Sequence, residues 1–324
     1  MVQAQVLEGS PGSDRSPRFV SHLQKAGRSV QVEDIFEASE ACAETLVGIM
    51  NETGRRRLIL SGSGDSLFAA QSAAPAMRAW SGEEFRTFTS IEAARYEMPA
   101  YADDAILIAV SNSGGSTRTR ESVAIAKALG IPSIGIVGSL DGPLAETADI
   151  VLHRPVALVG DQPDWSPRVY LNAAEYLAAL TSLFALGLFV GGHTGHVPEL
   201  QISEAKSRIA EALLHMEAAA AACDPITADL AQSMDGIETV FVLGAGPGRG
   251  TADYSAAKFH EQVPLNGVPQ DLEEWAHLQY FLTLNWREKA IVIVLASRGA
   301  SADRAAEMLT GIKQAGGRAI LATD

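Results

Sequence analysis

Short apolar runs alternate with polar, glycine-containing loops and helical segments along most of the chain. Residues 105–110 read AILIAV, and the polar stretch SNSGGSTRT follows at 111–119. An apolar run of this length is typical of a buried strand in a parallel sheet, and ESVAIAKAL at 121–129 has helical composition. The pattern therefore predicts a strand, a polar loop and a helix that opens within the loop.

The predicted loop has the chemistry of an anion site. It offers hydroxyl and amide groups at Ser111, Asn112, Ser113 and Ser116, and it contains no lysine. Backbone N–H groups and the helix dipole favour an anion at such a turn. The pattern of a nucleotide P-loop is absent, so we expect a small phosphate ester. The alternative is an ordinary capped helix start, because Ser and Thr are common N-caps.

The same order of elements occurs twice. RLILSGSGDS at 57–66 corresponds to ETVFVLGAGPG at 238–248, and residues 105–138 correspond to 290–324. The sequence therefore predicts an α/β protein with two doubly wound parallel-sheet units that arose by internal duplication. Residues 171–213 have helical composition and should link the units. We expect a mobile tail at 1–20, a first unit at 21–195 and a second at 196–324.

Each unit has a Gly-x-Gly turn after its first strand, but neither completes the dinucleotide fingerprint. The third glycine is replaced by Leu67 in one copy and by Arg249 in the other. We expect the glycines to serve tight strand–helix turns, and their neighbours Asp65 and Ser66 to contact substrate. The loop in the second copy, 297–301, has lost most hydroxyls, so the phosphate is expected in the first unit only.

Composition narrows the class of partner. The net charge of −14 argues against nucleic acid, and a hydrophobic fraction of 47% supports a large core. Cys42 and Cys223 lie far apart and suggest free thiols in a reducing cytoplasm. The apolar stretch Leu177–Gly192 predicts a buried helix rather than a membrane span, and the polar N-terminus lacks the apolar core of a signal peptide.

The duplicated unit with its S-x-S-G-x-[ST] loop resembles the sugar isomerase (SIS) domain. Residues 57–324 are similar to the tandem-SIS isomerase half of glucosamine-6-phosphate synthase and to related sugar-phosphate deaminases and deglycases. Three segments carry the resemblance. They are the loop at 111–116, the stretch DQPDWSPR at 161–168 with Ser166 as a substrate-binding serine, and the series Lys258, Glu261 and His277 after a Gly-x-Gly turn.

The resemblance implies a catalytic set in the second unit. A carboxylate above the C1–C2 bond can move a proton as general base and then acid, and Glu261 is the candidate. Lys258 shares a helical face with Glu261, while His277 suits ring opening because imidazole titrates near neutrality. The alternatives are a solvated Lys258–Glu261 pair and a histidine that caps or packs on its own helix.

Several positions depart from the family pattern. The usual turn threonine is Asp65, and the loop has Asn112 and Gly115 in place of glutamine and glutamate. Asp65 and Asp164, the latter in the stretch at 161–168, are added carboxylates that favour an amino-bearing substrate, and with it deamination or deglycation. The family continues into a tail that carries a catalytic lysine, whereas this sequence stops at Asp324, so we expect the second unit to be truncated.

These observations predict a cytoplasmic enzyme that acts on phosphosugars by C1–C2 proton transfer, either an aldose–ketose isomerase or an amino-sugar-phosphate deaminase or deglycase. We expect no metal or organic cofactor, no nucleic acid or membrane partner, and a homodimer with a shared active site. In the family the histidine comes from the neighbouring subunit. Residues 262–280 are expected to form an apolar arm that leaves its own domain. The alternative is a non-catalytic sugar-phosphate sensor, which would not need Lys258, Glu261 and His277.

Overall fold

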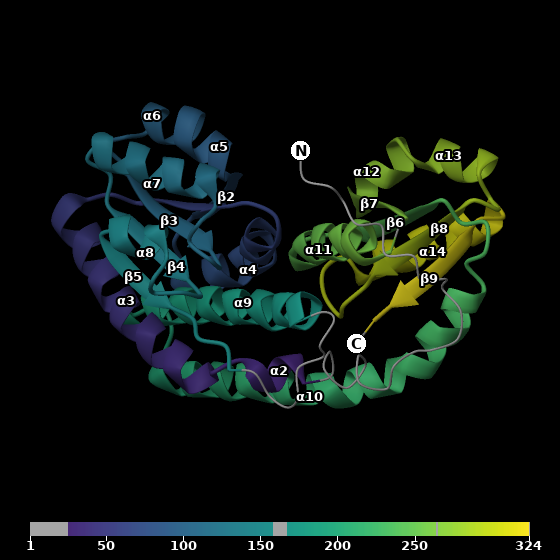
Figure 1. The fold of residues 1–324 in the computed structure, drawn as a ribbon, viewed down its shortest axis with the longest axis horizontal. Coiled ribbons are helices and arrows are strands. Elements are labelled where there is room, and N and C mark those ends of the chain that lie inside the picture. Colours follow the sequence, from purple (N-terminus) through teal and green to yellow (C-terminus); the bar gives the residue numbers. More distant parts are fainter. Residues whose placement is uncertain (1–24, 158–166, 264, 324) are drawn as a thin grey trace.

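The computed structural model describes residues 25–157, 167–263 and 265–323 (Figure 1). Within these residues the chain forms two parallel sheets that are covered by helices and joined by two long helices. The predicted α/β class with two doubly wound units is therefore confirmed. The expected tail at 1–20 lies outside the described residues.

The first sheet has five parallel strands in the order β2-β1-β3-β4-β5. Its strands are β1 (Arg57–Gly62), β2 (Phe85–Thr89), β3 (Ala105–Ser111), β4 (Ser133–Val137) and β5 (Ile150–His153). All seven residues of β3 are buried, because this strand is central and has helices on both faces. Its apolar run therefore shows no alternation with polar residues.

Helices cover both faces of this sheet. Leu58 and Leu60 of β1 pack with α3, α4 and α9, whereas Ile59 packs on the opposite face with η1, α7 and α8. Figure 1 shows α5, α6 and α7 on one side of the strands and α9 on the other. The helices of the first unit are α2 (Ala26–Ser29), α3 (Val32–Thr53), α4 (Asp65–Ser81), α5 (Ser90–Glu92), the π-helical turn η1 (Ala93–Glu97), α6 (Met98–Ala100), α7 (Thr117–Ala128) and α8 (Pro143–Thr147).

The second sheet has four parallel strands in the order β7-β6-β8-β9. This order repeats the β2-β1-β3-β4 part of the first sheet when β6 is matched to β1. The strands are β6 (Thr239–Gly244), β7 (Asn266–Asp271), β8 (Ala290–Leu295) and β9 (Arg318–Ala322). The helices around them are α11 (Pro247–Gln262), α12 (Leu272–His277), α13 (Tyr280–Asn285) and α14 (Ala302–Gln314).

The Gly-x-Gly turns have the structural role that the sequence predicts. Gly64 and Gly246 precede α4 and α11 with φ angles of 57° and 55°, a region that favours glycine. A Cβ atom on Gly62 would lie 2.9 Å from the amide nitrogen of Leu67, and one on Gly244 would lie 2.1 Å from the carbonyl oxygen of Gly248. Both turns therefore need their glycines for the backbone path.

Two long helices, α9 (Pro167–His193) and α10 (Glu199–Gln232), occupy the predicted linking region. Figure 1 shows α10 running along the base of the molecule from the first unit to the second. By length and composition, residues Ala173–His193 of α9 could cross a membrane. However, 72% of the 18-residue apolar stretch within this range is buried inside the protein. Leu183, Leu186 and Phe189 belong to the core of the first unit, so α9 is a core helix.

The boundary predicted at 195/196 lies in the short segment between α9 and α10. Ile202 and Leu213 of α10 pack with residues of the first unit, although they follow that boundary in sequence. The helix thus serves both units, and the exact boundary stays a prediction.

The units dock through α4 and α11. Gly250 of α11 approaches α4 so closely that a Cβ atom there would lie 2.4 Å from the carbonyl oxygen of Phe68 and 2.5 Å from Oγ of Ser72. The rings of Tyr176 and Tyr254 stack beside this contact, with centroids 3.8 Å apart and planes 19° apart. This docking sets one edge of the second unit against the carboxyl edge of the first sheet.

The predicted arm at 262–280 is wrong in its local structure. Residues 266–271 form β7, which pairs in parallel with β6 at the edge of the second sheet. An edge strand tolerates Pro269, which lacks an N–H donor. Leu272 and Trp275 are buried in the core of their own unit, whereas Val263 and Leu278 stay 43% and 57% exposed.

Candidate functional site

A cavity of about 320 Å³ lies where the carboxyl edge of the first sheet faces α11. Both units contribute to its wall. The first unit supplies the turn after β1 and the loop after β3, α9 supplies one side, and α11 supplies the other. The lining residues are Ser63, Gly64, Asp65, Ser66, Phe68, Asn112, Arg154, Glu175, Tyr176, Ala179, Ala257 and Glu261.

Three charged side chains form a chain of contacts at the mouth of this cavity. The Nζ atom of Lys258 lies 2.8 Å from Oδ2 of Asp65 and 2.7 Å from Oε2 of Glu261. The side chain of Lys258 is 16% exposed, whereas the side chain of Glu261 is 45% exposed and lines the cavity. Lys258 therefore joins a carboxylate from each unit, and the predicted Lys258–Glu261 pair exists on one face of α11.

The surroundings of Asp65 shift the pKa of its carboxyl group in two opposite directions. Burial raises the pKa of this carboxyl group, while the hydrogen bond and the charge of Lys258 lower it. The effect of burial is the larger, so the pKa of Asp65 is raised overall. The protein keeps this carboxyl group in place although the surroundings disfavour its charged form.

Two tyrosines, Tyr176 and Tyr254, lie beside these charges, and Tyr176 also lines the cavity. Burial raises the pKa of Tyr176 to about 12, and it also raises the pKa of Tyr254. Both phenols are therefore neutral near neutral pH. Lys258 Nζ lies 4.7 Å from the ring centroid of Tyr254, a distance at which the ring attracts the ammonium group.

The cavity also contains two charged residues that were not predicted from the sequence, Arg154 and Glu175. Arg154 follows β5 directly and is 1% exposed, and its Nη1 donates a hydrogen bond to the main-chain oxygen of Glu175 at 2.7 Å. A signal was present in the sequence, since a cation that directly follows an apolar strand lies at the carboxyl edge of the sheet. The burial of that cation could not be read from the sequence.

The predicted phosphate loop lies beside the cavity. Asn112 reaches the cavity, whereas Ser111 is 5% exposed at the end of β3. Ser113 is exposed, and its Oγ accepts a hydrogen bond from the amide of Gly115 at 3.2 Å. Ser116 is the N-cap residue of α7 but makes no side-chain capping bond, so its hydroxyl remains available to a ligand.

Of the remaining predicted residues, Ser66 lines the cavity from the first turn of α4. Ser166 lies outside the described residues. His277 lies at the end of α12 with a 66% exposed side chain, and its Nε2 is 3.3 Å from Oε1 of Glu273. The structure thus brings Asp65, Ser66 and Asn112 together with Glu261 around one cavity, and it places His277 of the same chain away from it.

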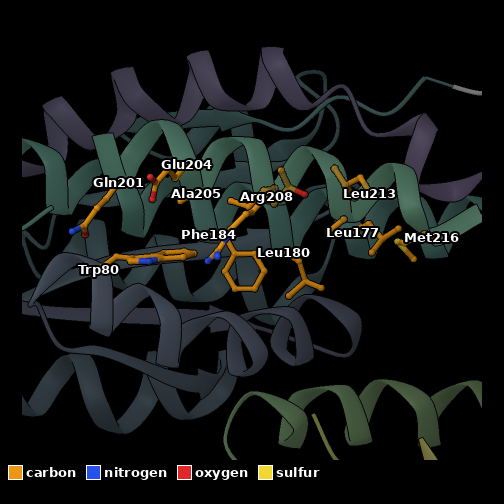
Figure 2. Close-up of a pocket in the computed structure, with 13 residues that line it drawn as sticks. Trp80, Leu177, Leu180, Phe184, Gln201, Glu204, Ala205, Arg208, Leu213 and Met216 are labelled. Carbon is orange, nitrogen blue, oxygen red and sulfur yellow. The ribbon is translucent and has the colours of Figure 1, made fainter. Parts of the chain in front are cut away.

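A larger cavity of about 610 Å³ lies between α9, α10 and the end of α4, and it contains none of the predicted residues. Figure 2 shows Trp80, Phe184 and Leu180 on one wall, facing the side chains of α10. Its lining is mostly apolar and lacks a cluster of catalytic groups. Within the described residues, no group of three or more His, Cys, Asp or Glu side chains is placed to hold a metal ion.

Comparison with known proteins identifies one matching domain family and several similar folds. Residues 53–157 match the SIS domain family. The match lies within the first unit and stops before the second, so the case for duplication depends on the repeated strand order and turns.

A curated relative is the glutamine–fructose-6-phosphate aminotransferase (isomerizing) of Thermotoga maritima, which is 26% identical over 187 residues. The aligned region is 56% of this chain but only 28% of that enzyme.

Two solved structures share the fold. The C-terminal domain of glucosamine-fructose-6-phosphate aminotransferase from Francisella tularensis aligns with a TM-score of 0.79 at 16% identity, over 97% of this chain and 86% of that one. The tagatose-6-phosphate ketose/aldose isomerase of Escherichia coli aligns with a TM-score of 0.70 at 15% identity, over 97% and 83%. Residues 53–157 thus match the SIS domain family, and the whole described chain shares its fold with these two structures.

Proposed function

We propose that this protein binds a phosphosugar in the cavity between its units and moves a proton between C1 and C2 of that sugar. The observation that carries the proposal is the position of Glu261. This carboxylate belongs to the second unit, yet it lines the same cavity as Asp65, Ser66 and Asn112 of the first. A phosphate held by the loop at 111–117 would place the rest of the sugar in front of Glu261.

Glu261 acts as the proton carrier in this proposal. A carboxylate that accepts the proton from one carbon can return it to the neighbouring carbon, so one group serves as base and then as acid. The Nζ atom of Lys258 lies 2.7 Å from Oε2 and holds this carboxylate in position on α11. The nearby phenols are neutral, so they add no further negative charge.

Three carboxylates around the cavity favour an amine on the substrate. Asp65, Glu175 and Glu261 all belong to its lining, and an ammonium group would find acceptors there. With a 2-amino aldose phosphate, transfer of the C2 proton to C1 leaves an imine at C2. Water then adds to that imine, giving the ketose phosphate and ammonia. We therefore favour deamination or deglycation over plain isomerisation.

We further propose a cytoplasmic homodimer. The free thiols of Cys42 and Cys223 are consistent with a reducing compartment. A second subunit would supply the histidine that opens the sugar ring, because His277 of the same chain lies away from the cavity.

The first test is a binding screen followed by turnover. Aldose, ketose and amino-sugar phosphates are tested for thermal stabilisation, which reports ligands that prefer the folded state. Binding compounds are then assayed for isomerisation and ammonia release. Glu261→Gln should lower turnover by at least ~10²-fold with little change in affinity. Glu288→Gln, an exposed glutamate of the same unit, is the matched control and should behave as wild type.

Each outcome has a clear consequence. Stabilisation without any turnover would contradict the enzyme and support a non-catalytic sensor. Turnover that survives Glu261→Gln would move the proton transfer to another group. Absence of binding by every phosphosugar would overturn the proposal as a whole.

A further inference from the structure

Ser90 is a buried serine that bridges two parts of the chain at the carboxyl edge of the first sheet. It begins α5 directly after β2 and is 1% exposed. The hydroxyl of Ser63 donates a hydrogen bond to Oγ of Ser90 at 3.2 Å, and Oγ of Ser90 lies 2.9 Å from Oγ1 of Thr119. One hydroxyl group therefore contacts residues 27 positions before it and 29 positions after it in the sequence.

The two partners of Ser90 belong to different parts of the candidate site. Ser63 lines the cavity from the turn after β1, next to Asp65. Thr119 lies in the first turn of α7, whose N-cap residue is Ser116. The first backbone N–H groups of a helix have no acceptor within that helix, so this turn can present them to an anion. Ser90 thus ties the end of α7 that is expected to face phosphate to the turn that carries Asp65.

In the described part of the chain, strand pairing does not join these two parts of the site. The ladder between β1 and β3 ends where Ser61 pairs with Ala109, and the ladder between β1 and β2 ends where Gly62 pairs with Thr89. The turn after β1 lies beyond both pairs. Side-chain contacts such as those of Ser90 therefore set the distance between this turn and α7.

A second pair of hydroxyl groups supports the same turn of α7. Ser122 Oγ donates to the main-chain oxygen of Thr119 at 2.7 Å, and Ser61 Oγ donates to Ser122 Oγ at 3.4 Å. Ser61, Ser90, Thr119 and Ser122 are each exposed by 1% or less. Buried hydroxyl groups cost free energy unless they are bonded, and a connected network of them fixes one relative position of the parts that it joins. Apolar side chains in this space would tolerate small shifts that hydrogen bonds do not.

We propose that Ser90 is a positioning residue, which holds the first turn of α7 at a fixed distance from the turn after β1 so that one phosphosugar contacts both. This inference rests on the proposed function. Ser90 is not among the residues that line the cavity, so it acts through Ser63 and Thr119. A ligand that spans both parts of the site depends on their alignment, whereas inorganic phosphate at the start of α7 does not.

A double-mutant cycle tests the bridge without any ligand. Ser90→Ala and Thr119→Val are made singly and together, and the free energy of unfolding of each variant is measured in urea. Because the two hydroxyl groups share one hydrogen bond, the double variant should lose less stability than the sum of the two single losses. Additive losses would mean that the two side chains do not act on each other, and the bridge would be wrong.

Affinity tests the positioning role. Calorimetry on the full chain compares fructose 6-phosphate, which spans both parts of the site, with inorganic phosphate titrated in competition with it. Ser90→Ala should raise the Kd of fructose 6-phosphate by about 3- to 10-fold, the range for one neutral hydrogen bond. The Kd of inorganic phosphate should change by less than about 2-fold, because its contacts lie on one side of the bridge.

Ser182→Ala is the matched control. Ser182 is a fully buried serine of α9, and its Oγ donates to the main-chain oxygen of Ala178 at 2.6 Å. The variant should lose stability, as Ser90→Ala does, but keep both affinities. A loss of fructose 6-phosphate affinity in this control would mean that reduced stability alone explains the effect of Ser90→Ala.

The remaining outcomes separate this inference from the proposed function. Equal weakening of both ligands by Ser90→Ala, unchanged affinities, or failure of inorganic phosphate to compete would each overturn the positioning role while the proposed function stands. If the wild type binds another sugar phosphate of the screen instead, that compound replaces fructose 6-phosphate in the comparison. If no sugar phosphate binds, the proposed function and this inference fall together.

Discussion

Lys258 of α11 and Asp65 of α4 are 193 residues apart in sequence, yet Nζ of the lysine lies 2.8 Å from Oδ2 of the aspartate. The contact joins the two units at the mouth of the cavity. Burial raises the pKa of Asp65 in spite of this partner. Burial of this carboxyl group costs stability, so its presence at the cavity points to a role in the site rather than in folding.

Replacement of Asp65 by asparagine should therefore stabilise the protein near neutral pH. Because its pKa is raised in the folded state, the free energy of unfolding that Asp65 contributes is largest below its ordinary pKa of about 4. That contribution falls as the pH rises through the raised value. Asp65→Asn should melt at a higher temperature than wild type near neutral pH, and the difference should shrink in acid.

Thermal unfolding at several pH values checks this expectation. Asp103→Asn, an exposed aspartate of the same unit, should show no such trend. If Asp65→Asn melts below wild type near neutral pH, the attraction of Lys258 outweighs the cost of burial. Substrate turnover should fall in the Asp65 variant even though its stability rises.

The close contact of α4 with α11 gives a second prediction. Gly250→Ala places a Cβ atom against Phe68 and Ser72 and should destabilise the protein by about 1–3 kcal/mol through overpacking. Gly248→Ala, in the same helix, meets nothing within 4 Å and should be neutral or stabilising by up to about 1 kcal/mol. Urea unfolding of the two variants measures the difference.

The Gly250 variant should also lose activity, because displacement of α11 separates Lys258 and Glu261 from the first unit. Equal stability of the two glycine variants would mean that the helices adjust to the extra atom without cost.

Much of the fold could be predicted from the sequence. Continuous apolar runs such as 105–110 predicted the central strands correctly. A strand that is buried on both faces has apolar residues at every position, so its sequence shows no alternation. The repeated turns predicted a repeated strand order. β7 was missed because Pro269 and Gly267 weaken the strand signal, and only its place at the sheet edge makes them acceptable.

The candidate site was predictable in part. Lys258 and Glu261 are neighbours within one helix, so their spacing was enough to pair them. Asp65 and Lys258 come together only when α4 docks on α11, and no local pattern encodes that docking. The buried position of Arg154 was missed for a similar reason, because it depends on the packing of α9 against the end of β5.

Matched serines in the two units test the phosphate loop. Ser116 and Ser301 are the N-cap residues of α7 and α14, and neither makes a side-chain capping bond. Ser116→Ala should weaken phosphosugar binding by roughly 10- to 100-fold, the loss of one charge-assisted hydrogen bond. Ser301→Ala should leave the affinity unchanged, because the second loop is not expected to hold phosphate.

Titration calorimetry with a phosphosugar from the screen gives both affinities. Ser113→Ala should behave like Ser116→Ala. Equal affinities across the Ser113, Ser116 and Ser301 variants would place the phosphate outside this loop.

We expect His277 to serve the cavity of a second copy of the chain rather than its own. His277 is 66% exposed and lies away from the cavity of its own chain. Next to it in sequence, Leu278, Phe281 and Leu282 expose 57%, 63% and 38% of their surfaces, more apolar area than solvent favours. We expect this surface to contact a second copy of the chain and to carry His277 into the partner's cavity. Phe281→Glu should then weaken dimerisation, as measured by sedimentation.

Complementation decides the matter. Glu261→Gln chains and His277→Ala chains should each be inactive, and they are mixed under conditions that exchange subunits. A shared site restores one wild-type cavity in each mixed dimer, so activity should return to roughly a quarter of the wild-type level at random exchange. A mixture of Glu261→Gln and Lys258→Met chains is the control. Glu261 and Lys258 of one chain serve the same cavity, so neither cavity of a mixed dimer regains both residues and this mixture should stay inactive. If the first mixture also stays inactive while exchange is demonstrated, His277 does not serve the partner's site.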